Sequence, residues 1–153
     1  MPLYRISYIS RAPETRGELR RMFAASLLSQ ARRNNDERGV TGFLAYADDY
    51  FLQMIEGGRG IISDLIMRIG ADDRHRDLHI IRAEPADSRL FHQKMACFDI
   101  VSTKTPLLMR FSVSAQFCPY QLAPNALDEL FAELVVTARQ PRQFQPETQS
   151  SAA

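Results

Sequence analysis

Hydrophobic and polar residues alternate near the start of the chain and predict a strand over residues 3–9. One face of this strand carries Tyr4, Ile6 and Tyr8, and the other face carries Arg5 and Ser7. Alternation with a period of two indicates a strand that buries one face. We therefore expect Tyr8 to lie in the core, where its phenol needs a hydrogen-bond partner.

The next segment has helical periodicity and predicts a helix over about residues 16–33. Residues 15–18 fit a capping box, in which Thr15 and Glu18 satisfy backbone amides at the helix start. The pair Asn34-Asn35 then ends the helix, a position where asparagine is common. The stripe expected to face the core consists of Leu19, Met22, Phe23 and Leu27.

The remaining elements follow from the same periodicities. Two turn-forming residues, Asp48-Asp49, stand between two apolar runs and predict a hairpin. A glycine-rich turn opens a second helix, and a later helix repeats apolar residues at i, i+3, i+4 and i+7. The predicted strands are 42–47, 50–56, 79–84 and 95–101, and the apolar stripes of the predicted helices cover 61–69 and 127–138.

The order β-α-β-β-α-β with one additional strand predicts an α+β fold of the ferredoxin-like type. The first two helices should pack on one face of a mixed sheet, and the helix at 127–138 should cover the other face. We divide the chain into a core over 1–101, a helical cap over 102–139 and a tail over 140–153. Pro, Gln and Ser dominate the tail, and we expect it to be disordered.

Composition places the chain among ordinary globular domains. It has 153 residues, 45% of them hydrophobic and 24% charged, and a net charge of +1. This balance indicates no nucleic-acid partner and no membrane surface, and no apolar run approaches the roughly 20 residues of a membrane span. Cys97 and Cys118 have no zinc-site spacing, so we expect a reduced, cytoplasmic protein without a metal site.

Gln53 is the polar residue that fits its surroundings least well, because residues 51–55 are otherwise apolar on both faces of the strand. A buried amide without partners costs roughly 1–3 kcal/mol. Two interpretations remain open. Gln53 and Tyr8 satisfy each other as a structural pair, or both line a pocket between sheet and helices and bind a polar ligand.

A charged segment after the second helix offers further candidates, namely Arg68, Asp72, Arg74 and His75. A solvated helix end explains them. Alternatively, the basic side chains hold a phosphate or a ring carbonyl of a ligand. The pair Asn34-Asn35 has two corresponding interpretations, helix termination or the same pocket. From the residues alone, the chain is a small α+β domain with a polar pocket.

Four motifs resemble, in order and spacing, those of BLUF domains, the blue-light sensors that bind flavin. They are residues 3–10, residues 33–35 with 39–42, residues 51–57 (Phe-Leu-Gln-Met-Ile-Glu-Gly) and residues 73–75. The tyrosine on the first strand and the Phe-Leu-Gln-x-x-Glu-Gly strand carry most of the resemblance. The similarity extends over most of the chain, to about Val101.

The resemblance implies a flavin bound non-covalently between the two helices, usually FAD, with FMN or riboflavin as alternatives. In the family, blue light drives electron and proton transfer from the tyrosine to the flavin. The glutamine then rearranges, and absorption shifts slightly to the red. Nothing is turned over, so we expect no enzymatic activity. The implied flavin-binding residues are Tyr8, Asn34, Asn35, Gln53, Arg68, Asp72, Arg74 and His75.

The chain departs from the family in the fifth strand, which usually carries Trp-x-Met. Here the segment reads Gln93-Lys94-Met95, and the chain has no tryptophan. We hypothesise that Met95, with Gln93, relays the change at Gln53 to the C-terminal helices. About 50 residues follow Val101, too few for a fused enzymatic domain. We expect output through a homo-oligomer or a signalling partner; the alternative is a flavin-dependent enzyme or a dark flavin carrier.

Overall fold

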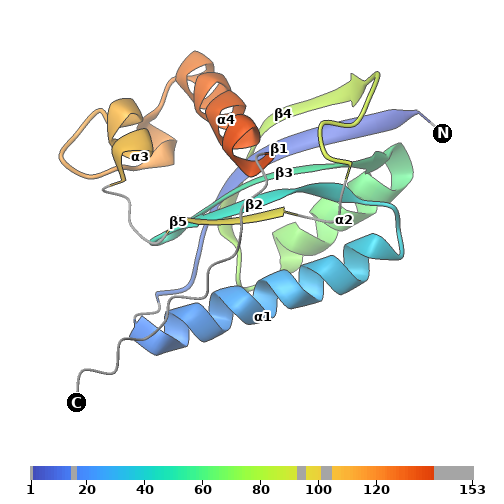
Figure 1. The fold of residues 1–153 in the computed structure, drawn as a ribbon, viewed down its shortest axis with the longest axis horizontal. Helices are drawn as coiled ribbons and strands as arrows, with labels where there is room; N and C mark the ends of the chain where they lie inside the picture. Colours follow the sequence, from blue (N-terminus) through green and yellow to red (C-terminus); the bar gives the residue numbers. More distant parts are fainter. Residues whose placement is uncertain (1, 15–16, 93–95, 101–104, 140–153) are drawn as a thin grey trace.

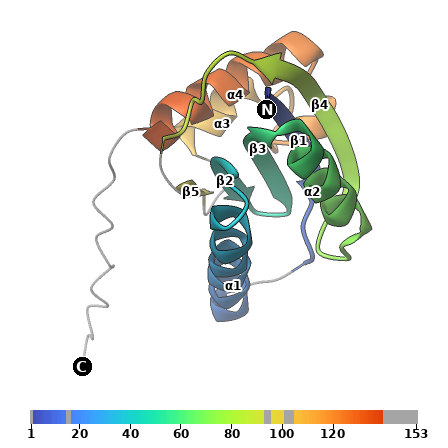
Figure 2. The same ribbon diagram turned by 90° about the vertical axis from the view of Figure 1, so that its right-hand side faces the viewer.

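A five-stranded sheet separates two layers of helices in the computed structural model (Figures 1 and 2). The structure describes residues 2–14, 17–92, 96–100 and 105–139. The strands are β1 (Leu3–Arg11), β2 (Thr41–Ala47), β3 (Tyr50–Gly58), β4 (Arg76–Ala86) and β5 (Ala96–Ile100). The helices are α1 (Gly17–Asp36), α2 (Arg59–Ala71), α3 (Pro106–Phe111) and α4 (Pro124–Arg139), with a 3₁₀ turn at Pro119–Gln121.

The strand order is β4-β1-β3-β2-β5, which confirms the predicted ferredoxin-like fold with one additional strand. β1 pairs with β3 and β4 in antiparallel orientation, and β2 pairs with β3 in the same way. β5 is parallel to β2, so the sheet is mixed. The predicted hairpin joins β2 to β3, and Asp48 adopts the positive φ of 51° that tight hairpin turns require.

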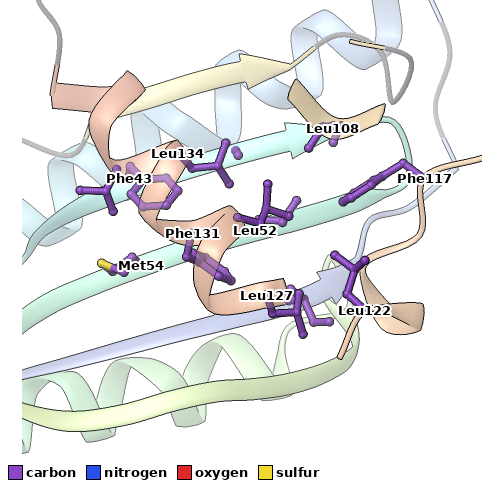
Figure 3. Packing of buried hydrophobic residues seen from close by; sticks show 14 of the residues in the cluster. Phe43, Leu52, Met54, Leu108, Phe117, Leu122, Leu127, Phe131 and Leu134 are labelled. Carbon is purple, nitrogen blue, oxygen red and sulfur yellow. The ribbon is translucent and has the colours of Figure 1, made fainter. Parts of the chain in front are cut away.

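The larger apolar cluster lies between the sheet and α4, as the periodicity of this helix predicted (Figure 3). Phe43 of β2 and Leu52 and Met54 of β3 face the helix. Burial of these side chains attaches the C-terminal helices to one face of the sheet. The residues that α4 contributes are Leu127, Leu130, Phe131, Leu134 and Val135.

Helices α1 and α2 lie on the face of the sheet opposite α4 (Figure 1), and two smaller apolar clusters lie under them. The α2 cluster contains Ile6, Val40, Ile55 and Ile62. The α1 cluster contains Ala12, Leu27, Leu44, Tyr46 and Phe51. The two helices therefore cover different parts of the same sheet face, as predicted.

The predicted core stripe of α1 is wrong at its first two positions. Leu19 and Met22 are 70% and 62% exposed, whereas Phe23 and Leu27 pack on the sheet. A helix of 20 residues is about 30 Å long, whereas the seven residues of β2 span about 23 Å, so the first turns extend past the strand. Met22 also lies about 100° around the helix from Phe23, away from the sheet.

Several expectations fall on residues outside the described ranges. These are Thr15 and Arg16 of the capping box, Gln93 and Met95 of the relay, and the tail over 140–153. Among the helices of the described part, none is long and apolar enough to span a membrane.

A substitution at Gly42 can test how closely β2 approaches β3. Its φ is +155°, and a Cβ at this position would lie 2.0 Å from the carbonyl oxygen of Met54. Gly42→Ala should therefore lower the free energy of unfolding by about 2–3 kcal/mol, measured by urea denaturation, because the strands must separate.

The matched control is Gly60→Ala in α2, where a new Cβ meets nothing within 4 Å. Alanine suits a helix better than glycine, so this variant should be as stable as the natural chain or up to about 1 kcal/mol more stable. Equal stability of the two variants would contradict the steric role of Gly42.

Candidate functional site

Tyr8 and Gln53 lie directly opposite each other on the neighbouring strands β1 and β3. Tyr8 is fully buried and Gln53 is 5% exposed. The Tyr8 hydroxyl donates a hydrogen bond to Oε1 of Gln53. The mutual hydrogen bond of the first sequence-based interpretation is therefore present, and it satisfies the buried phenol.

This pair lies in the sheet between the two apolar clusters that α1 and α2 cover. Along β3, Phe51 belongs to the α1 cluster and Ile55 to the α2 cluster, with Gln53 between them. Along β1, Tyr8 follows Ile6 of the α2 cluster in the same alternation. A band of polar side chains thus interrupts the core on this face.

Burial raises the pKa of the Tyr8 phenol well above its ordinary value, and the nearby Asp72 carboxylate adds to this rise. The hydroxyl consequently keeps its proton throughout the physiological range. Tyr8 is available as a hydrogen-bond donor and as a source of an electron together with a proton.

His75 joins Tyr8 and Gln53 in this polar band, together with Ser10. Its Nδ1 lies 2.8 Å from Oγ of Ser10, and its ring centroid lies 4.6 Å from Phe51 and 6.0 Å from Tyr8. Burial is the main cause that lowers the pKa of His75; Asp72 opposes this effect and Arg74 adds to it, and the resulting pKa is about 4. The imidazole is therefore neutral at physiological pH.

Ser10 is a site residue that the sequence reasoning missed. Its side chain is fully buried and contacts His75. The available signal was its place two residues after Tyr8, because alternate residues of a strand share a face. The polar band is defined below as Tyr8, Ser10, Gln53 and His75.

Asp72 and Arg74 form a closed ion pair beside the polar band. Arg74 Nη2 lies 2.6 Å from Oδ2 of Asp72, and the Arg74 backbone amide donates to Oδ1 at 2.9 Å. Hydrogen bonds from Arg74 lower the pKa of Asp72 to about 2. Arg74 Nη1 also donates to Oε1 of Gln30 at 2.9 Å, which links this turn to α1.

The asparagine pair and Arg68 are not equivalent in the structure. Asn35 is 3% exposed, and its carbonyl oxygen accepts bonds from the amides of Arg38 and Val40. Asn34 and Arg68 are exposed. Adjacent residues of a helix differ by about 100° in direction, and here Asn35 faces inward while Asn34 faces solvent.

The chemistry of the polar band suits a planar polar ring. A phenol, an amide, an imidazole and a hydroxyl offer neutral donors and acceptors, and apolar side chains flank them on both sides. No group of three His, Cys, Asp or Glu residues in the described part of the chain could hold a metal ion. A flavin ring fits such a donor set better than a metal ion does.

The pH dependence of stability tests the environment of His75. Because its pKa falls from 6.5 to about 4 on folding, the unfolded chain binds more protons between these pH values. The free energy of unfolding should therefore decrease by about 2–3 kcal/mol as pH falls through this window. Urea denaturation across the window measures the change.

His75→Asn removes the titrating group, so its stability should change less over the same window. Asp72 contributes to stability in a separate pH range. Its pKa is lowered from 3.8 to about 2 on folding, so its contribution to the free energy of unfolding is lost only as pH falls between these values. Parallel curves for the natural chain and His75→Asn would contradict a neutral, buried histidine.

Comparisons with known proteins agree with this geometry. The family model for BLUF, described as sensors of blue-light using FAD, matches residues 3–96. The chain is 29% identical over 109 residues to photoactivated adenylate cyclase subunit alpha of Euglena gracilis, covering 71% of this chain and 10% of that protein. It is 32% identical over 104 residues to subunit beta of Euglena longa, covering 66% of this chain and 12% of that protein. The chain thus spans only about a tenth of the length of these relatives.

Solved structures show the same fold over more of the chain. BlsA in its photo-activated state has a TM-score of 0.74 and 25% identity, covering 92% of this chain and 99% of that one. BlrB in its dark state has a TM-score of 0.69 and 26% identity, covering 89% and 97%. BlrP1 of Klebsiella pneumoniae with FMN and cyclic diGMP has a TM-score of 0.61 and 25% identity, covering 88% and 36%. With the family match over residues 3–96, these likenesses show that the chain belongs to the BLUF family of flavin-binding blue-light sensors.

Proposed function

We propose that this chain is a blue-light photoreceptor in which Tyr8 and Gln53 respond to excitation of a non-covalently bound flavin. The buried hydrogen bond between these two side chains, on adjacent strands, is the observation that carries the proposal. The flavin supplies absorption of blue light and an acceptor for one electron and one proton. FAD is the proposed cofactor, as in the family description.

Tyr8 acts as the electron and proton donor. Its raised pKa keeps the phenol protonated in the dark, so loss of an electron is accompanied by loss of the proton from its hydroxyl. Oε1 of Gln53 accepts this hydrogen bond and would be the first acceptor of that proton on its way to the flavin. Burial keeps bulk water away from the step.

Gln53 acts as the switch. A neutral amide has a donor end and an acceptor end, and exchanging them changes which hydrogen bonds exist around it. Its strand is central, with β1 and β2 paired on its two sides, so the backbone moves only slightly while the side chain rearranges. A local hydrogen-bond change then becomes the signal.

The flavin-binding residues are proposed from burial and chemistry. Tyr8, Gln53 and His75 contact one face of the ring pocket, and Asn35 bonds a polar edge of the ring. Arg74 would hold the far carbonyl or the ribityl-phosphate part of the cofactor, and Asp72, which accepts hydrogen bonds from Arg74, would position its guanidinium. Asn34 and Arg68 are exposed and stay predictions of the family resemblance. FMN is the alternative cofactor, and one similar protein, BlrP1, is described with FMN.

Output is proposed to be non-catalytic and to pass through α4 to a homo-oligomer interface or a signalling partner. The cyclase relatives share only the matched region, which is about a tenth of their length, so their activity is not carried over. The relay through Met95 and Gln93 remains a prediction, because both residues lie outside the described ranges.

Light spectroscopy on two variants tests the proposed pair. The flavin-loaded chain should show a flavin spectrum that shifts slightly to the red under blue light and recovers in the dark. Tyr8→Phe should bind flavin but show no red shift, because the phenolic proton is gone. Gln53→Leu should bind flavin and lose the same signal, because the switching amide is gone.

Tyr4→Phe is the matched control, since Tyr4 lies on the same strand and the same face as Tyr8 but belongs to the α2 cluster. This variant should keep the red shift. A normal photocycle in Tyr8→Phe or Gln53→Leu would contradict the role proposed for the substituted residue. Bound flavin that only bleaches in the natural chain would favour an enzyme or a dark carrier.

The two asparagines provide a further test of how the flavin is held. Asn35 is buried and Asn34 is exposed, so Asn35→Ala should weaken flavin binding about tenfold, the scale of one buried hydrogen bond. Asn34→Ala should change affinity less than about twofold, as for an exposed contact. Fluorescence titration with FAD measures both, and the reverse order would overturn the assignment of Asn35.

A further inference from the structure

Glu56 is a completely buried carboxylate that the proposed photochemistry does not use. It lies on β3 three residues after Gln53 and therefore on the opposite face of the sheet. The residues directly opposite it are Arg5 on β1 and Thr41 on β2. Both bond its carboxylate, Arg5 through Nε and Nη2 at 3.3 and 3.2 Å and Thr41 through its hydroxyl at 2.8 Å.

The same carboxylate holds the connection that follows β4. The backbone amides of Leu90 and Phe91 donate to its two oxygens at 3.0 and 2.8 Å. Arg5 Nη2 also donates to the carbonyl oxygen of Ser88 at 2.8 Å. Residues 88–91 are thereby fixed to three neighbouring strands at one end of the sheet.

Arg89 strengthens this attachment from the other side. Its Nη1 donates to the Thr41 hydroxyl at 2.7 Å, and its Nη2 donates to the carbonyl oxygen of Gly39 at 2.8 Å. Thr41 thus accepts from Arg89 while it donates to Glu56. Five donors converge on the two oxygens of the Glu56 carboxylate, three on Oε2 and two on Oε1.

Phe91 connects this network to the C-terminal helices. Its ring is buried and lies 5.6 Å from the ring of Phe43, and Phe43 lies 6.1 Å from Phe131 of α4. Phe43 is also the residue at which β2 begins to pair with β5. A continuous set of contacts therefore runs from β3, through Glu56, Phe91 and Phe43, to α4.

We propose that Glu56 is a positioning residue that couples the light-driven change at Gln53 to α4, by holding the Phe91 amide so that the Phe91 ring stays packed against Phe43 of β2, which in turn contacts α4. This inference rests on the proposed photoreceptor function. A hydrogen-bonded carboxylate with all its donors satisfied is stiff. A small shift of β3 at Gln53 is therefore passed to residues 88–91 instead of being absorbed by them.

Glu56→Gln tests the proposal on the full, flavin-loaded chain. The carboxamide places N–H donors against the donors that converge at this position, while the polar band on the other face stays intact. We expect the red shift to remain. The light-minus-dark change in hydrogen exchange over residues 106–139 should fall by roughly threefold or more, within the range that single residues along a packed route produce.

Glu84→Gln is the matched control, because it makes the same chemical change at a side chain that is 43% exposed on β4. It should keep both the red shift and the exchange response. Phe91→Leu is the second variant, which keeps the backbone amide for Glu56 but removes the ring contact with Phe43. It should keep the red shift and lose the exchange response in the same way.

A full exchange response in Glu56→Gln would overturn the proposal, and so would loss of its red shift, which would place Glu56 in the photoactive pair. If Glu56→Gln fails to fold, an undiminished response in Phe91→Leu overturns the proposal instead. The proposal is also overturned if the natural chain shows the red shift but no light-dependent change in hydrogen exchange over residues 106–139. Absence of the red shift in the natural chain would instead refute the proposed function, so the two failures are distinguishable.

Discussion

The hydrogen bond between Tyr8 and Gln53 depends on the register of β1 against β3, and the rest of the site depends on that register. Directly opposite residues of antiparallel strands share one face, and a slip by one residue would turn every side chain to the other face. Ile6 and Ile55 hold the register through their packing under α2. The apolar core therefore places two polar side chains opposite each other inside it.

The side chains of β3 contact the polar band on one face of the sheet, and the C-terminal helices and residues 88–91 on the other face. Gln53 faces α1 and α2, whereas Leu52, Met54 and Glu56 face the C-terminal helices and residues 88–91. Because the side chains of a strand alternate, neighbouring residues of one rigid segment contact the polar band and the cap. The polar band and the proposed output helix α4 are then separated by the thickness of one strand.

Periodicity predicted the strands, the hairpin and the buried face of α4, because each depends on residues close in the sequence. It failed for Leu19 and Met22, since the exposure of the first turns of α1 depends on where β2 ends. It also left Asn34 and Asn35 equivalent, although the helix buries only Asn35. Glu56 stood in a recognised motif, but its partners come from residues up to 51 positions away, which no local pattern indicates.

The polar band contains no group that changes charge near neutral pH. The Tyr8 phenol is held protonated and the His75 imidazole is held neutral, and Asp72 beside the band is held ionised by Arg74. A rearrangement of the Gln53 amide consequently alters hydrogen-bond geometry and not the net charge of the site. Such a change acts only over the length of a hydrogen bond, unlike a new charge, whose field extends further. A switch of this kind needs a closely packed, fully bonded connection to its output, and the Glu56 carboxylate with its five donors supplies the proposed one on the same strand as Gln53.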